Sequence, residues 1–157
     1  MYRVRKTITI HATPEFVYRK ARDPKFWGTW FTGLIGPKAL EGDGSVGTVV
    51  EYAYALAGLE FPLTIEVTDD VMTPKYCRSS GTIKGPFSGT QTFEYVETED
   101  GTEVTLEMAY TIPGSALARM ANILVIESME ERSAELTLEN LKLLCELEAV
   151  DREDMPV

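Results

Sequence analysis

The stretch EGDGSVGTVVEYAYALAG, Glu41 to Gly58, distinguishes two classes of fold, because its glycine cluster opens either a phosphate-binding loop or a β-strand. A phosphate loop needs a helix directly after the glycines, since the free amides of a helix N-terminus bind the anion. Here the glycines precede an alternating run, with Val50, Tyr52 and Tyr54 in one phase and Glu51 in the other. A period of two predicts a strand. We therefore interpret the glycines as a turn with positive φ angles.

The same period of two continues along the chain after this stretch and occurs once before it. We predict strands over residues 2–10, 34–41, 46–56, 61–72, 75–84, 87–98 and 102–112, separated mostly by turns rich in glycine, proline and aspartate. Links this short join antiparallel neighbours. The strands are therefore expected to form an antiparallel meander with one apolar face.

Three helical segments complete the pattern. Thr13-Pro14 and Asp23-Pro24 are start signals that predict short helices over 14–21 and 24–31. A long helix is predicted from 116 to 148, where no glycine or proline occurs, and the acidic tail 150–157 is expected to fray. Only the long helix can cover the apolar face of the sheet. The sequence thus predicts an α+β fold in which a curved seven-stranded antiparallel sheet wraps around a long C-terminal helix, with two short helices between strands 1 and 2.

Length and composition exclude several classes of protein. The 157 residues fit a single domain, predicted over 1–149, and a hydrophobic content of 44% excludes wholesale disorder. No apolar run approaches the ~20 residues of a membrane span, so no integral membrane association is expected. A net charge of −10 argues against nucleic acid as a partner. His11 is the only histidine, which excludes a histidine-rich metal site, and we expect neither a metal nor a cofactor.

The N-terminal segment and the cysteines indicate a cytoplasmic protein. Residues 1–10 alternate charged and apolar side chains and lack the apolar core of a signal peptide. Cys77 and Cys145 have no metal-binding or disulfide spacing and are expected to be free, buried thiols. Residues 1–38 carry eight basic and two acidic side chains. This basic segment either faces an anionic ligand or membrane surface or, as we favour, pairs with the acidic C-terminal helix.

Four segments resemble one known superfamily in the same order. They are ITIHATPEFV at 8–17, DPKFWGTW at 23–30, the glycine-rich EGDGSVGT at 41–48, and the long helix after Pro113-Gly114. Together they are similar to the START-domain and pollen-allergen superfamily, also called SRPBCC, whose members have the helix-grip fold. The closest branch is the polyketide cyclase/dehydrase and lipid-transport group. The resemblance covers nearly the whole chain, but its motifs are short and indicate a fold more than a substrate.

A sheet that curls around one helix tends to enclose a cavity. The strand phases predict a concave face that is mostly apolar, with tyrosine hydroxyls and one amide, which suits a flat or lipid-like ligand. Trp27, Trp30 and Phe31 of the second short helix are expected to form part of a lid. The predicted ligand-binding residues are Trp27, Trp30, Tyr52, Tyr54, Ile65, Arg78, Gln91, Phe93, Tyr95, Met108, Tyr110, Met120 and Leu124.

Two sets of charged residues leave alternatives open. Arg78 lies in a strand with no clear apolar phase, so it points either into the cavity, toward an anionic group, or outward to Glu94 or a neighbouring acid. The usual exposure of arginine favours the outward position. Glutamates at 127, 130, 131 and 135 have the spacing to seat a metal ion, but a solvated stripe is the favoured interpretation.

Three functions remain compatible with the sequence. The leading one is binding or carriage of a hydrophobic small molecule, such as a lipid, an isoprenoid or a polyketide-like compound. The resemblance also allows a cyclase, dehydrase or aromatase, in which Arg78 would stabilise an enolate and Tyr95 or Tyr110 would relay a proton. A protein-interaction module of the same fold would instead have a collapsed cavity. The wide apolar surface of the last helix also allows a homodimer.

Overall fold

Seven strands form one antiparallel sheet in the order β1-β7-β6-β5-β4-β3-β2. A computed structural model describes residues 1–120 and 122–152, without the side chains of 119, 120 and 150–152. The strand at one edge, β1, pairs with the last strand along its whole length, so that Tyr2 lies opposite Tyr110. The strands are β1 (Tyr2–Ile10), β2 (Leu34–Glu41), β3 (Val49–Leu56), β4 (Leu59–Met72), β5 (Tyr76–Lys84), β6 (Ser88–Thr98) and β7 (Gly101–Thr111).

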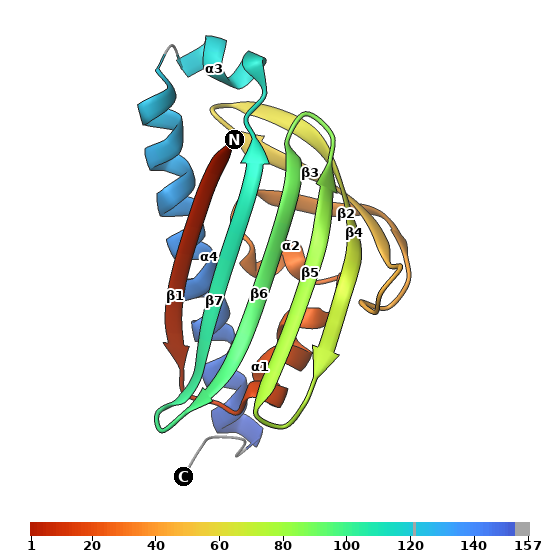
Figure 1. Cartoon of the computed structure of the whole chain (residues 1–157), viewed down its shortest axis with the longest axis vertical. Coiled ribbons are helices and arrows are strands. Elements are labelled where there is room, and N and C mark those ends of the chain that lie inside the picture. The colour runs from red at the N-terminus through yellow and green to blue at the C-terminus, as the bar shows by residue number, and fades with distance from the viewer. Residues whose placement is uncertain (121, 153–157) are drawn as a thin grey trace.

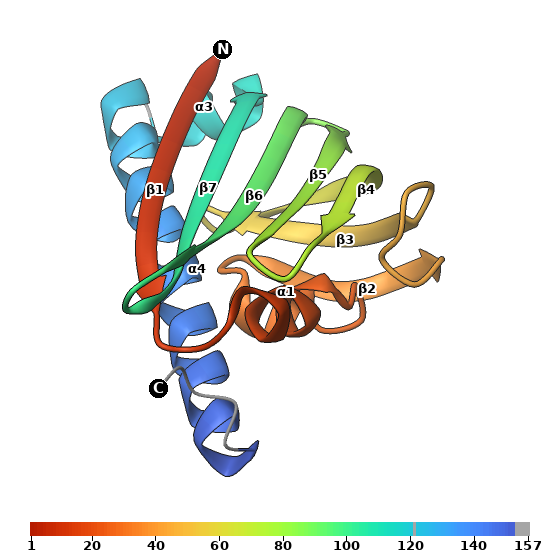
Figure 2. The same ribbon diagram turned by 60° about the horizontal axis from the view of Figure 1, so that its bottom comes forward.

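The helices cover one face of this sheet. They are α1 (Pro14–Arg22), α2 (Trp27–Trp30), α3 (Gly114–Met120) and α4 (Ile123–Arg152). Figure 1 shows α4, α1 and α2 on the same side of the sheet, and Figure 2 shows how far β2 and β3 curl away from the plane of β1 and β7. The predicted α+β helix-grip architecture is therefore confirmed. None of the described helices is long and apolar enough to cross a membrane.

Two helix predictions were wrong in their limits. The expected helix from 116 to 148 is two helices, because Asn122 caps the start of α4: its Oδ1 accepts the amide of Leu124 at 2.9 Å. The second helix continues to Arg152, past the predicted start of the frayed tail at 150, and residues 153–157 lie outside the described part. The expected helix 24–31 is reduced to α2, since Asp23 accepts the amide of Lys25 in a turn.

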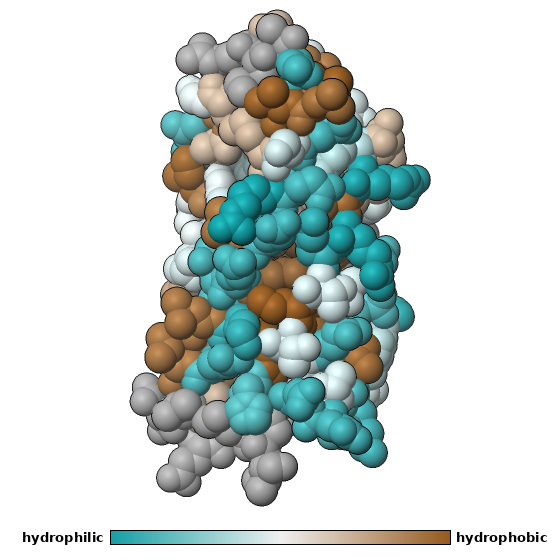
Figure 3. Space-filling view, turned by 90° about the vertical axis from the view of Figure 1, so that its left-hand side faces the viewer, coloured by the Kyte–Doolittle hydropathy of each residue, from teal (hydrophilic) through white to brown (hydrophobic). Residues whose placement is uncertain are grey.

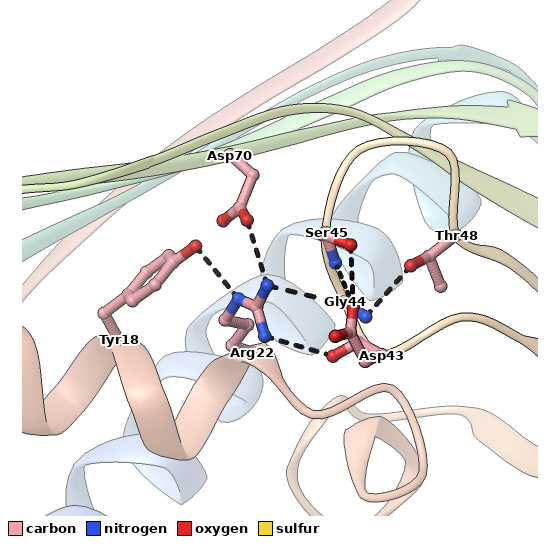
Figure 4. Close-up of polar contacts among 7 residues, drawn as sticks. All are labelled: Tyr18, Arg22, Asp43, Gly44, Ser45, Thr48 and Asp70. Carbon is pink, nitrogen blue, oxygen red and sulfur yellow. Dashed lines mark hydrogen bonds and ion pairs between the residues drawn. The ribbon is translucent and has the colours of Figure 1, made fainter.

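The glycine-rich loop between β2 and β3 is a turn that binds its own side chains. Thr48 Oγ1 accepts the amide of Gly44 at 2.9 Å, and Asp43 Oδ1 accepts the amide of Ser45 at 3.1 Å. A strand follows it, as predicted, and no helix N-terminus is available for a phosphate. Arg22 of α1 fastens this loop to β4 by donating to the carbonyl oxygen of Asp43 and to Asp70, both at 3.1 Å (Figure 4).

Ion pairs join the basic N-terminal segment to the acidic α4. Lys6 on β1 contacts Glu131 at 2.7 Å, and Lys20 on α1 contacts Glu148 at 2.5 Å. The favoured prediction, that the basic residues pair within the molecule, holds for both lysines. Exposed pairs of this kind contribute at most about 1 kcal/mol each, so they orient α4 more than they stabilise it.

Both cysteines are free and completely buried, as predicted. Burial raises the pKa of the Cys145 thiol to about 12 and that of Cys77 above its ordinary value. Neither thiol is therefore a nucleophile at neutral pH.

The close contact of β6 with β7 leads to a test of the fold. A Cβ at Gly89 would lie 1.9 Å from the carbonyl oxygen of Ala109, which is backbone and cannot move aside. We predict that Gly89→Ala lowers the free energy of unfolding by about 3 kcal/mol, at the upper end for overpacking. Gly114→Ala is the control, because no atom lies within 4 Å of its added Cβ, and it should change stability by less than about 0.5 kcal/mol. Urea denaturation measures both; equal effects would contradict this pairing of β6 with β7.

Candidate functional site

A cavity of about 40 Å³ lies between the concave face of the sheet and α4. Its walls are mostly apolar, and Gln91 and Met108 meet there across the pairing of β6 with β7. Such a lining with a few polar groups is typical of small-molecule sites. The lining residues are Phe31, Leu34, Tyr54, Leu63, Ile65, Ile83, Phe87, Gln91, Met108, Tyr110, Glu130, Ser133 and Ala134.

One carboxyl group is buried in this apolar wall. Glu130 of α4 is 3% exposed, and the phenol of Tyr110 donates to its Oε2 at 2.5 Å. The phenol of Tyr54 contacts both oxygens of Glu130, at 3.0 and 3.1 Å. The two tyrosines belong to β7 and β3, which are separated in the sheet by three other strands. The carboxyl group therefore connects α4 to both halves of the curved sheet.

The environment of Glu130 favours its neutral form. Burial raises its pKa, and the hydrogen bonds from Tyr110 and Tyr54, which favour the ionised form, oppose that effect. Burial and the neighbouring carboxyl group raise the pKa of Tyr110 and of Tyr54, so both phenols keep their protons. The site thus holds a carboxyl group with a raised pKa, hydrogen-bonded by two phenols, in an otherwise apolar space.

A second, smaller cavity of about 30 Å³ continues the first toward α1. Phe31 and Gln91 line both cavities, and Trp30, Phe93 and Tyr95 line the second. Phe93 packs edge-on against Trp30 at 5.6 Å and stacks with Tyr95 at 6.3 Å. Each cavity has the size for only a few water molecules. The interior is therefore nearly filled by aromatic side chains in this conformation.

A surface groove of about 570 Å³ lies outside the inner cavity. It runs between α4 and the hairpin of β3 with β4, and it shares Tyr54, Glu130 and Ser133 with the inner cavity. These three side chains therefore lie in the wall that the two spaces have in common. The ring of Tyr54 lies so close to Gly33 that an added Cβ there would approach it to 2.6 Å. The buried carboxyl group therefore lines the outer groove as well as the inner cavity.

The structure brings most of the predicted site residues together. Nine of them line the two cavities: Trp27, Trp30, Tyr54, Ile65, Gln91, Phe93, Tyr95, Met108 and Tyr110. Tyr52 does not line either cavity, because its ring stacks on Trp27 and its hydroxyl donates to the carbonyl oxygen of Pro24. Leu124 is 69% exposed and points away from the interior, so its prediction was wrong. The side chain of Met120 lies outside the described part.

Arg78 was also predicted wrongly as a cavity residue. It lies on the convex face of β5, opposite Glu94 in the pairing with β6, and its Nε contacts Asp69 at 2.5 Å. Asp69, together with the hydroxyl of Tyr76, raises the pKa of Arg78 further, so the guanidinium is always charged there. The outward alternative is therefore confirmed. No enolate in the cavity can be stabilised by this cation.

The important residue that the sequence analysis missed is Glu130, which we expected in a solvated stripe. It lies four residues after Ile126 and four before Ala134, and both of these are fully or nearly fully buried. Leu138, Ala134, Glu130 and Ile126 follow one another at intervals of four residues, and the other three are buried. This spacing was the signal in the sequence that Glu130 lies on the buried face of the helix. Glu131 and Glu135 instead face Lys6 of β1. Among the described residues no group of three potential ligands could hold a metal ion.

The comparisons place the chain in a family. Residues 1–146 match the family model described as polyketide cyclase / dehydrase and lipid transport, and the chain belongs to this family. A search of curated proteins finds no match. The family assignment agrees with a helix-grip domain that has an apolar interior.

Solved structures from several bacteria share the fold. The protein TTHA0849 from Thermus thermophilus is 24% identical, with a TM-score of 0.71 over 94% of this chain and 99% of that one. The Zhui aromatase/cyclase from Streptomyces sp. R1128 is 15% identical, with a TM-score of 0.66 over 92% and 93%. A START superfamily protein from Mycobacterium smegmatis is 17% identical, with a TM-score of 0.63 over 96% and 99%. At these identities the likeness shows the fold alone.

The buried carboxyl group predicts a specific pH dependence of stability. The pKa of Glu130 is raised on folding. Its contribution to the free energy of unfolding is therefore present at low pH and is lost as the pH rises through the raised pKa of the folded state. Glu130→Gln cannot ionise. The variant should therefore gain stability relative to the wild type above about pH 4.3, by up to about 1.4 kcal/mol per pH unit until the raised pKa is passed.

Chemical denaturation from pH 4.5 to 8.5 measures this difference. Glu131→Gln is the matched control, since Glu131 is the next residue but faces Lys6 and solvent, and it should keep the wild-type slope. Parallel pH profiles for Glu130→Gln and the wild type would contradict the raised pKa.

Proposed function

We propose that the protein binds a hydrophobic small molecule between the sheet and α4, with a polar group of that molecule at Glu130. The observation that carries this proposal is a buried carboxyl group, held by two phenols, in an otherwise apolar wall. Burial of an acid costs stability, and a buried acid with a perturbed pKa beside a cavity is a candidate functional group. The matching family, whose description includes lipid transport, supports the same class of ligand, such as a lipid, an isoprenoid or a polyketide-like compound.

Binding requires the interior to expand. Typical ligand pockets have volumes of about 300–1,000 Å³, whereas the inner cavities measure about 40 and 30 Å³. The outer groove of about 570 Å³ touches the inner cavity at Tyr54, Glu130 and Ser133. Rotation of Tyr54 would join the groove to the interior, and rotation of Phe31 would join the two inner cavities. The four-residue helix α2 would move as the lid.

Catalysis is the second candidate, because the phenol of Tyr110 donates a hydrogen bond to the buried carboxyl group of Glu130. A neutral carboxylic acid in an apolar site can protonate a carbonyl or a leaving hydroxyl group of a polyketide-like substrate. In this reaction Glu130 takes the acid role, and Arg78, on the convex face, takes none. A cyclase or dehydrase of this kind needs no cofactor.

The nearly filled interior favours a third candidate, an interaction module of the same fold. This function would need an exposed apolar surface and no ligand-sized cavity. The two free, buried cysteines support a cytoplasmic setting for each of the three candidates.

Ligand binding can be tested without knowing the ligand. Solvent extracts of the purified protein are analysed by mass spectrometry, and fatty acids, isoprenoids and polyphenols are screened by thermal shift. We predict a positive shift from at least one compound that carries a hydroxyl, carbonyl or carboxyl group. Glu130→Leu should weaken its binding about tenfold or more, because a buried hydrogen bond to the acid is lost.

Arg78→Ala is the matched control and should leave the affinity unchanged within twofold, since Arg78 lies on the convex face. An empty extract together with no thermal shift across the panel would contradict ligand binding and favour the interaction module. Conversion of a polyketide-like compound that stops in Glu130→Gln would assign the site to catalysis.

A further inference from the structure

Helix α4 carries a second apolar stripe that the domain does not cover. The side chains of Val125, Met129, Leu143 and Leu147 are 38–61% exposed, and Leu136 between them is half-buried. Their spacings of four, seven, seven and four residues place all five on one face of a helix. The buried stripe through Glu130 lies on a different face. Figure 3 shows hydrophobic surface at the left margin of the β1 and α4 side, beside a hydrophilic band.

The stripe is symmetric about Leu136. Met129 and Leu143 each lie seven residues from it, and Val125 and Leu147 each lie eleven residues from it. A two-fold interface joins a surface to the same surface of a second copy. If residue i of the first copy contacts residue j of the second, then residue j of the first also contacts residue i of the second. In an antiparallel pair of α4 helices that cross at Leu136, Met129 meets Leu143 and Val125 meets Leu147. From Val125 to Leu147 the stripe covers 22 helical steps, which is about 33 Å of helix.

The charges beside the stripe fit the same symmetry. Arg132 and Glu139 lie on one flank, four residues before and three residues after Leu136, and are 3.8 Å apart within the chain. An axis at Leu136 places Arg132 of each copy opposite Asn140 of the other, and Glu139 is only about 1.5 Å further along the helix, within reach of the guanidinium. Arg132 also contacts Glu135 of its own chain at 3.1 Å. This matters because each copy carries a net charge of −10, and two such molecules repel unless charges at their contact are complementary.

We propose that α4 is an interface with a second copy of this chain, in which two α4 helices pair antiparallel and cross at Leu136. The pairing covers the exposed apolar stripe and forms two ion pairs between Arg132 and Glu139. It also affects the site, because Met129, Arg132 and Leu136 line the outer groove. The second copy therefore forms part of the cover of that groove, outside Glu130.

The first experiment measures the oligomeric state of the full chain by sedimentation equilibrium. We expect a dimer, and we expect Leu143→Glu to raise its dissociation constant by about a hundredfold or more, since each interface then buries two unpaired charges. Leu124→Glu is the control: Leu124 is 69% exposed on the same helix but outside the stripe, and the variant should dimerise like the wild type. Circular dichroism checks that both variants are folded.

Cysteine cross-linking tests the antiparallel direction, since the native Cys77 and Cys145 are buried. A mixture of Met129→Cys and Leu143→Cys proteins should form a disulfide-linked heterodimer under mild oxidation. Met129→Cys alone should not cross-link, because its two copies would lie about 21 Å apart along the helices, far beyond disulfide reach. Equal cross-linking of Met129→Cys with itself would overturn the proposed direction.

Two outcomes of sedimentation would overturn the interface itself. One is a wild-type protein that stays monomeric at several hundred micromolar. If that monomer also binds phosphatidylcholine vesicles in a flotation assay, the stripe is assigned to a membrane surface instead. The other is a dimer that Leu143→Glu leaves intact. Neither outcome bears on ligand binding at Glu130, which the thermal-shift screen tests separately.

Discussion

Removal of the Glu130 carboxyl group from water is the constraint on which the site depends. A buried acid without partners costs several kcal/mol, and this cost sets the arrangement of its neighbours. Tyr54 from β3 and Tyr110 from β7 both donate to it, so α4 must lie where the two strands converge. The same contacts hold a carboxyl group with a raised pKa at the wall shared by the inner cavity and the outer groove. Glu130 therefore both positions α4 against the sheet and supplies the carboxyl group of the candidate site.

Helix α4 has three faces, and each face lies in a different environment. Its buried stripe, with Ile126, Ala134 and Leu138, fills the concave side of the sheet. Glu131 on a second face pairs with Lys6 of β1. The third face, with Leu143 exposed, is left for contacts outside the domain. A helix with apolar residues on two faces is expected when it serves as both a core element and an interface.

The sequence predicted the fold well because strand alternation and turn residues are local signals. The glycines before β3 were correctly interpreted as a turn, since alternation after Gly47 excluded a helix. The break at Asn122 was missed because a helix can start at a capping asparagine without any glycine or proline.

The candidate site was harder to predict than the fold. Phase alone placed Tyr54, Gln91, Met108 and Tyr110 in the cavity, since alternate residues of a strand share a face. Strand phase could not predict the direction of the Arg78 side chain, because neither phase of β5 is apolar. That side chain points outward and forms an ion pair with Asp69 on the neighbouring strand. Glu130 was missed because hydropathy assigns a glutamate to the surface, whereas its burial depends on two tyrosines distant in sequence.

The most direct test of this account is a ¹³C NMR titration of the carboxyl groups, with Glu130 assigned through Glu130→Gln. We predict a pKa for Glu130 above the ordinary glutamate value of about 4.3, and a Glu130 resonance that shifts when an apolar ligand with a polar end is added. The Glu131 resonance should not respond to that ligand. A pKa of Glu130 at or below about 4.3, with a resonance that bound ligand leaves in place, would contradict the claim that this carboxyl group is the polar centre of the site.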